Sequence, residues 1–394
     1  MSATSGHHCT QAEPALFVAL ELGWSEWKLA FSTDAYSAPR LRTLAARRLE
    51  ALLEELARAK RRLGLADDAP VRSCYEAGRD GFWLHRFLQA HGVDNLVVDS
   101  ASIEVRRQRR RRKTDRLDAQ KLVSMLLRHW AGEKRIWSIV TVPGVAEEDR
   151  RHLHRDLLEL KGEKTRHTNR IKGMLAAVGV ELAEVGDDLA EQLGQQRTWD
   201  GAALPAELHR RLLREHERWQ LVQRQIRDLE NERSRRIRTA PEPHLDKVRR
   251  LLMLRGIGPS SAWLFTMEFF AWRRFRNRRQ VAALAGLTPT PYQSGDSSHE
   301  QGISKVGNRR LRYMAIEIAW CWLRYQPSSA LTQWFQRRFA AGNSRLRRIG
   351  IVALARKLLV ALWRYLETGE IPAGAEVVPW YCKQGGWKLA SACP

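Results

Sequence analysis

Short apolar runs and helical spacings alternate in the first third of the chain. Four runs have the length and residue types of strands, at residues 16–20, 27–31, 71–75 and 95–98. Two segments place their leucines and aromatic residues at helical spacing, at residues 40–63 and 81–91. A hairpin, a helix, and further strands separated by a helix predict an α/β domain over residues 1–140.

The rest of the chain has mostly helical patterns. From Leu208 to Leu229, seven positions follow one another at alternating steps of four and three, and six of them are apolar. This heptad pattern favours a two-stranded coiled coil or a long helical hairpin, although an amphipathic helix on its own domain fits it too. Residues 150–175 predict a second long helix, which is a possible partner.

Glycine content and charge divide the remaining sequence. We expect a helical, coiled-coil linker over residues 141–245 and a Gly-punctuated, basic and mostly helical domain over 246–345. A helix and a tail rich in Pro, Gly and Trp fill residues 346–394.

The net charge indicates a polyanionic partner. Among 394 residues, 67 are Lys or Arg and 44 are Asp or Glu, so the formal charge is +23. No window is apolar enough to cross a membrane, and the N-terminal apolar run is too short for a signal peptide. Five scattered cysteines without CxxC spacing fit a reducing cytosol. We therefore expect a cytoplasmic protein associated with the bacterial nucleoid and with no membrane partner.

Four acidic residues stand where an α/β domain places its chemistry. Glu21 and Glu76 follow predicted strands, and Asp115 and Asp118 lie three residues apart, on one face of a predicted helix. Carboxylates of this kind bind Mg²⁺, and two Mg²⁺ ions suit phosphodiester cleavage. Asp115 and Asp118 also fit a purely structural role, because acids stabilise a helix N-terminus.

Basic and glycine-rich segments are the candidate nucleic-acid contacts. Directly before the paired acids runs a cluster of cations: Arg106, Arg107, Arg109, Arg110, Arg111, Arg112 and Lys113. Such a run suits the phosphate backbone, and a solvated loop is the alternative. Gly256 and Gly258 resemble the turn of helix-hairpin-helix modules, whose N–H groups face a phosphate, although ordinary tight turns carry the same pattern.

Ser294 is a candidate nucleophile. It precedes a glycine on an expected loop, downstream of two prolines and upstream of the cations Lys305, Arg309 and Arg310. A serine oxygen can attack phosphorus, and cations stabilise the charge that develops. Ser-Gly is also a common turn dipeptide, so the residue types alone leave both readings open.

Several motifs in this order resemble the insertion sequence 110 type of transposases, the DEDD/serine recombinases that include Piv-type DNA invertases. The resemblance covers about residues 15–340. It rests on Tyr75-Glu-Ala-Gly78, Lys113-Thr-Asp-Arg-Leu-Asp-Ala119, Arg255-Gly-Ile-Gly258, Arg274-Phe275, Ala285-Gly-Leu-Thr-Pro289, Ser294-Gly295, Lys305-Val-Gly-Asn308 and Leu311-Arg312.

The resemblance implies an RNase H-like (RuvC-like) N-terminal domain, a coiled-coil linker and a C-terminal serine domain. It assigns Glu21, Glu76, Asp115 and Asp118 as Mg²⁺ ligands and Ser294 as the nucleophile of a phosphoserine intermediate. It also implies a bridge RNA that selects donor and target DNA, and assembly as a dimer or a dimer of dimers.

One residue departs from the family pattern. The first acid is usually Asp, and Glu21 is one methylene longer, which matters because Mg²⁺ demands tight octahedral geometry. Asp99, after the next strand, is a secondary candidate ligand. Two alternatives therefore stay open, a metal-dependent DNA junction nuclease and a non-catalytic RNA- or DNA-binding relative.

Overall fold

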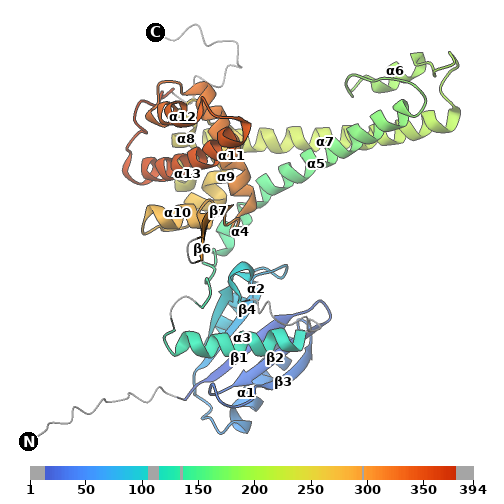
Figure 1. The fold of residues 1–394 in the computed structure, drawn as a ribbon. Helices are drawn as coiled ribbons and strands as arrows, with labels where there is room; N and C mark the ends of the chain where they lie inside the picture. Colours follow the sequence, from blue (N-terminus) through green and yellow to red (C-terminus); the bar gives the residue numbers. More distant parts are fainter. Residues whose placement is uncertain (1–13, 105–114, 134–135, 295–296, 379–394) are drawn as a thin grey trace, which may run out of the picture. The chain divides into compact units, whose positions relative to one another are not determined.

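The computed structural model describes residues 14–104, 115–133, 136–294 and 297–378. The chain forms two compact units, Met1–Val142 and Pro143–Pro394 (Figure 1). The first is a mixed α/β unit and the second consists mainly of helices, which agrees with the predicted fold class. In the described residues, no helix is both long and apolar enough to span a membrane.

A five-stranded sheet forms the centre of the first unit. Its order is β3-β2-β1-β4-β5, with antiparallel pairing from β3 to β1 and parallel pairing from β1 to β5. The strands are β1 (Leu16–Leu22), β2 (Glu26–Ser32), β3 (Arg40–Ala45), β4 (Val71–Glu76) and β5 (Val93–Val98). The predicted hairpin and the two later strands are thus confirmed.

Helices cover both faces of this sheet. Alternate residues of β1 point to opposite faces, so Val18 and Leu20 pack on one side and Phe17 and Ala19 on the other. The first side is covered by α1 (Leu49–Arg62) and α2 (Trp83–Ala90), and the second by α3 (Asp115–Trp130). Both faces of the central strand are therefore buried.

The predicted helix over residues 40–63 is wrong in its first part. Residues 40–45 form strand β3, which pairs with β2 from Arg40 opposite Phe31 to Ala45 opposite Glu26. Leucines at 41 and 44 fit a helical spacing, but pairing with a neighbouring strand satisfies the backbone hydrogen bonds of this segment and fixes it as a strand. The helix begins only at Leu49.

Two long helices form an antiparallel hairpin at the start of the second unit. They are α5 (His152–Ala176) and α7 (Ala206–Thr239), preceded by α4 (Val145–Asp149) and separated by α6 (Leu189–Gln195) (Figure 1). The predicted heptad positions Leu212, Trp219, Val222 and Ile226 are buried. The seam of α7 thus faces a helix of its own chain, which is the helical-hairpin reading of the pattern.

The remaining elements follow this hairpin in the chain, and the helices among them build one hydrophobic core with its base. They are α8 (Pro243–Met253), α9 (Pro259–Phe265), a π-helix η2 (Thr266–Phe270), α10 (Arg278–Leu284), β6 (Pro289–Ser294), β7 (Ser297–Ile303), α11 (Arg309–Tyr325), α12 (Ala330–Phe339) and α13 (Ser344–Thr368). Helix α13 fills the centre of this core through Leu354, Leu358 and Leu362.

Side-chain caps set where the last four helices begin. Asn277, Asn308, Ser329 and Asn343 each precede a helix and accept a hydrogen bond from a backbone N–H of its first turn. Such caps satisfy amide groups that have no partner inside the helix. These caps explain why a short polar segment precedes each helix in this otherwise apolar region.

Candidate functional site

Glu21 and Glu76 end neighbouring parallel strands. The register pairs Leu20 of β1 with Tyr75 of β4, so the two glutamates occupy the next positions along both strands. By alternation, each lies on the face that bears Ala19 and Cys74, which is the face covered by α3. Glu21 is half-buried and Glu76 is exposed.

The direction of α3 brings its N-terminus toward these glutamates. The Arg72 guanidinium lies 3.9 Å from the Trp130 ring centroid, and the Cys74 thiol lies 3.9 Å from the Leu122 carbonyl oxygen. Helix α3 therefore runs antiparallel to β4, and its half-buried Asp118 lies toward the end of β4 that carries Glu76.

The described carboxylates do not complete a metal site. Among described residues, no group of three His, Cys, Asp or Glu side chains is placed to hold a metal ion. Asp115 begins α3, but its side chain lies outside the described part of the structure. Oxygen donors on adjacent strand ends have the right chemistry for Mg²⁺, so the four-acid assignment stays a prediction.

Asp99 has a structural partner. Its carboxylate accepts a hydrogen bond of 3.1 Å from the Ala101 N–H and caps the short 3₁₀ helix η1 (Ser100–Ser102). A cap of this kind accounts for an acid at the end of β5 without a metal.

Ser294 is the last residue of β6, at the turn of a two-stranded hairpin. It pairs with Ser297, the first residue of β7, so the expected irregular loop is instead a strand end. The side chain of Ser294 lies outside the described part of the structure. The hairpin places this residue about 17 Å from Pro289 at its base, given the rise of a strand.

Two glycine motifs clamp the base of this hairpin. Lys305 N donates to Gly286 O at 3.2 Å, and Asn308 N donates to Leu284 O at 3.2 Å. Gly286 and Gly307 have φ of +66° and +90°, and a Cβ at Gly307 would lie 2.3 Å from Leu284 O. The two motifs flanking Ser294 thus need glycine because their backbones meet closely.

Three predicted phosphate contacts lie beside this clamp. Lys305, Arg309 and Arg310 are exposed, and the two arginines open helix α11 after its Asn308 cap. The cations Arg106, Arg107, Arg109, Arg110, Arg111, Arg112 and Lys113 lie outside the described residues.

The turn between α8 and α9 has internal partners. Gly256 has φ of +90°, and a Cβ there would approach the Tyr325 Cβ to 3.2 Å. The Gly258 N–H donates to Ser261 Oγ at 3.1 Å. The glycines thus permit a close turn, and their predicted contact with a phosphate remains a prediction.

A buried carboxylate, Glu268, was missed by the sequence reasoning. It is 4 % exposed on the π-helix, accepts two hydrogen bonds from Arg155, and accepts a third, of 3.2 Å, from Asn308 Nδ2. Burial raises the pKa of Glu268, but Arg155, Arg151 and Arg310 outweigh this effect and hold it below its usual value. One acid inside the apolar run Leu264–Phe270 was the available signal.

Comparisons with known proteins identify the family. Residues 248–335 match the model described as "Transposase IS116/IS110/IS902 family". A Sinorhizobium fredii protein named "Putative transposase y4rJ" is 43 % identical over 373 residues, covering 92 % of this chain and 94 % of that protein. The "Transposase for insertion sequence element IS1328" of Yersinia enterocolitica is 27 % identical over 56 % of this chain and 63 % of its own. The resemblance carried by the sequence motifs is confirmed, and the chain belongs to the IS110-type family of transposases.

Proposed function

We propose that this transposase cleaves and rejoins DNA through a covalent bond to Ser294. The observation that carries the proposal is the position of Ser294 at the end of a hairpin whose clamped base lies beside three exposed cations, Lys305, Arg309 and Arg310. A nucleophile at the end of a hairpin can reach a DNA backbone, and the cations favour a bound phosphate.

The chemistry is a double exchange at phosphorus. The Ser294 oxygen forms a bond to the phosphorus, the bond from phosphorus to one deoxyribose oxygen breaks, and that oxygen leaves as a hydroxyl with the serine proton. A hydroxyl of another strand then attacks the phosphoserine, and Ser294 regains a proton. The phosphodiester energy is conserved, so no nucleotide cofactor is required.

The N-terminal unit is proposed to be RNase H-like and to assist this chemistry. Glu21, Glu76, Asp115 and Asp118 would hold Mg²⁺, which neutralises charge on a scissile phosphate when bound. Support comes from the two glutamates on adjacent strand ends and from the direction of α3. Because the first acid of the family is usually Asp, substitution of Glu21 tests the proposed Mg²⁺ site.

The partners are proposed to be DNA, both element ends and target, and a bridge RNA. The family resemblance and the net charge of +23 support this assignment. Assembly as a dimer or a dimer of dimers completes the proposal, although the heptad seam of α7 is already covered by α5.

The test is a denaturing gel for a protein–DNA adduct. Purified protein, Mg²⁺, labelled element-junction DNA and RNA transcribed from the flanking non-coding DNA are combined. Wild type is compared with Ser294→Ala, Asp118→Ala and the matched control Ser297→Ala, which changes the serine paired with Ser294. We expect an adduct in wild type and in Ser297→Ala that is absent in both Ser294→Ala and Asp118→Ala.

Other outcomes separate the alternatives. Cleavage with free ends and no adduct would indicate a metal-dependent nuclease. Nucleic-acid binding without cleavage would indicate a non-catalytic relative, and Glu21→Asp would then be tested for rescue. An adduct that persists in Ser294→Ala would refute Ser294 as the nucleophile. An adduct that forms without the RNA would refute the requirement for a bridge RNA.

A further inference from the structure

A groove runs along one face of α13. The opposite face of this helix is buried in the core through residues such as Leu354, Leu358 and Leu362. The groove face alternates cations with small and branched aliphatic residues: Arg345, Arg348, Ile349, Val352, Ala353, Arg356, Lys357, Val360, Ala361 and Arg364. Arg345 and Arg364 are about 28 Å apart along the helix axis.

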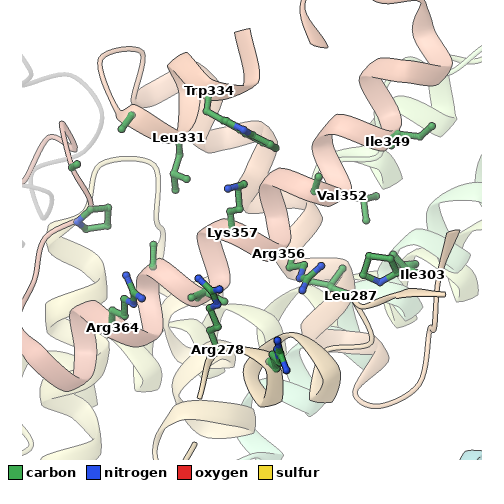
Figure 2. Close-up of a pocket in the computed structure, with 18 of the residues that line it drawn as sticks. Arg278, Leu287, Ile303, Leu331, Trp334, Ile349, Val352, Arg356, Lys357 and Arg364 are labelled. Carbon is green, nitrogen blue, oxygen red and sulfur yellow. The ribbon is translucent and has the colours of Figure 1, made fainter. Parts of the chain in front are cut away.

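Three other elements build the walls of the groove. Arg278 and Arg279 come from α10, Leu331 and Trp334 from α12, and Pro289, Gly302 and Ile303 from the base of the β6–β7 hairpin (Figure 2). The cavity has a volume of about 1250 Å³. This volume exceeds that of a usual small-molecule site, so the groove suits an extended ligand.

The groove carries a large excess of positive charge. Seven cations line it, against the single carboxylate of Glu370: Arg278, Arg279, Arg345, Arg348, Arg356, Lys357 and Arg364. Within the described part of the chain, no ion pair involves any of these seven cations. Elsewhere in this unit, arginines such as Arg155 and Arg249 do pair with acids. The groove cations are therefore available to an anionic ligand.

The floor of the groove is apolar. Leu287, Ile303, Ile349 and Val352 contribute to it, and Ile349 is 52 % exposed. The Lys357 ammonium lies 4.7 Å from the centroid of the Trp334 ring, which joins a cation to an aromatic surface (Figure 2). Phosphates along the cations and unstacked bases on the apolar floor would satisfy both features, whereas a duplex keeps its bases stacked inside.

We propose that the groove binds an unpaired stretch of the DNA strand on which the enzyme acts. This inference rests on the proposed function. Continuity with the hairpin favours DNA as the occupant, because Pro289 and Ile303 line the groove while the same hairpin ends at Ser294. The hairpin extends about 17 Å from its base to Ser294, so a strand that leaves the groove along the hairpin would reach the proposed nucleophile.

Fluorescence anisotropy with labelled oligonucleotides tests the proposal. The probes are one sequence as single-stranded DNA, as duplex DNA and as single-stranded RNA. The groove variant is Arg348→Ala/Arg356→Ala/Arg364→Ala, and the matched control is Arg211→Ala/Arg214→Ala/Arg224→Ala. The control removes three exposed arginines of α7 with the same change of net charge. Melting temperatures establish that each variant is folded.

We expect the groove variant to lose about tenfold or more in affinity for single-stranded DNA, and its salt slope to fall by about 2. The control should change affinity less than threefold. Trp334→Ala should weaken binding of single strands while leaving the salt slope unchanged, because it removes stacking and no charge.

Three results would overturn the inference. Equal losses of affinity in the groove and control variants would indicate an effect of net charge alone. A loss of affinity for duplex DNA only would indicate a duplex site. Tighter binding of RNA than of DNA by wild type, lost in the groove variant, would make RNA the occupant. The groove and the proposed function are tested by different measurements. Ser294→Ala should bind single-stranded DNA with the affinity of wild type even though it forms no adduct. If the groove variant loses its affinity for single-stranded DNA but still forms the adduct, both assignments are independent, and Ser294 remains the nucleophile.

Discussion

Arg155 and Glu268, 113 residues apart, form a bidentate ion pair between α5 and the π-helix. Arg155 Nε lies 2.8 Å from Glu268 Oε1, and Nη2 lies 3.1 Å from Oε2. Glu268 also accepts from Asn308, whose own Oδ1 accepts from the Leu311 N–H at the start of α11. One buried carboxylate therefore ties the long helical hairpin to the helix that follows the Ser294 hairpin.

Loss of the Glu268 charge is predicted to destabilise the second unit. Glu268→Gln leaves Arg155 without its counter-charge and should lower the free energy of unfolding by about 2 to 4 kcal/mol. The control is Glu163→Gln, which breaks the exposed pair with Arg166 and should cost about 1 kcal/mol or less. Urea unfolding measures both, and similar losses in the two variants would contradict the role of burial.

Local patterns in the sequence predicted where most strands of the first unit lie. They did not predict which segments pair with one another. Alternation and strand ends located β1 and β4 with their terminal glutamates. Residues 40–45 were misassigned, because only their pairing with β2 decides between strand and helix. The heptad of α7 predicted a seam but not whether α5 or a second chain covers it.

Sites built from distant segments escaped the sequence reasoning. Glu268 stands in a run that reads as core, and its arginine partner lies 113 residues earlier. The cations of the groove come from two helices, α10 and α13, that are far apart in the sequence, so no local run of charge indicates the groove. The candidate metal ligands at the strand ends could be located from the sequence because parallel strands bring their carboxyl ends to one edge of the sheet. The Glu268 cluster and the groove depend on tertiary packing instead.

His154 is predicted to make stability depend on pH. It is buried, neither ring nitrogen has a hydrogen-bond partner among the described residues, and burial together with Arg233 lowers its pKa to about 4. The unfolded histidine titrates near 6.5, so between about pH 6.5 and 4 unfolding takes up a proton and stability falls as pH falls.

The variant His154→Leu removes this proton uptake. Its free energy of unfolding should vary less between pH 6.5 and 4 than that of wild type, by up to about 3 kcal/mol over the window. His152→Leu, at an exposed position two residues away, should keep the wild-type dependence. Unfolding curves at several pH values measure this difference. If the free energy of unfolding of His154→Leu depends on pH as that of wild type does, His154 is not the group responsible.

The clamp at the base of the Ser294 hairpin is predicted to require glycine. In Gly307→Ala the new Cβ meets Leu284 O, and φ of +90° disfavours any side chain, so we expect a loss of about 2 kcal/mol or more. Gly173→Ala lies in α5 with nothing within 4 Å and should be neutral or stabilising. Thermal unfolding compares them, and a stable Gly307→Ala protein would show that the hairpin base can move.

The acids at the strand ends are predicted to make Mg²⁺ stabilise the protein. A ligand that binds only the folded state raises its stability by an amount set by ligand concentration over Kd. Glu76→Gln should therefore reduce the increase in melting temperature that Mg²⁺ produces. Asp99→Asn is the control, because Asp99 caps η1 and an asparagine oxygen can accept the same hydrogen bond, so we expect little change in the melting temperature or in that increase.

Glu21→Asp separates two accounts of the unusual first acid. If the longer side chain displaces the carboxylate, the shorter one should strengthen the Mg²⁺-dependent increase in melting temperature. If the backbone already compensates, Glu21→Asp should weaken it, since the shorter side chain then falls short of the ion. No response to Mg²⁺ in wild type or in any of these variants would refute the four-acid metal site while leaving the test of Ser294 unaffected.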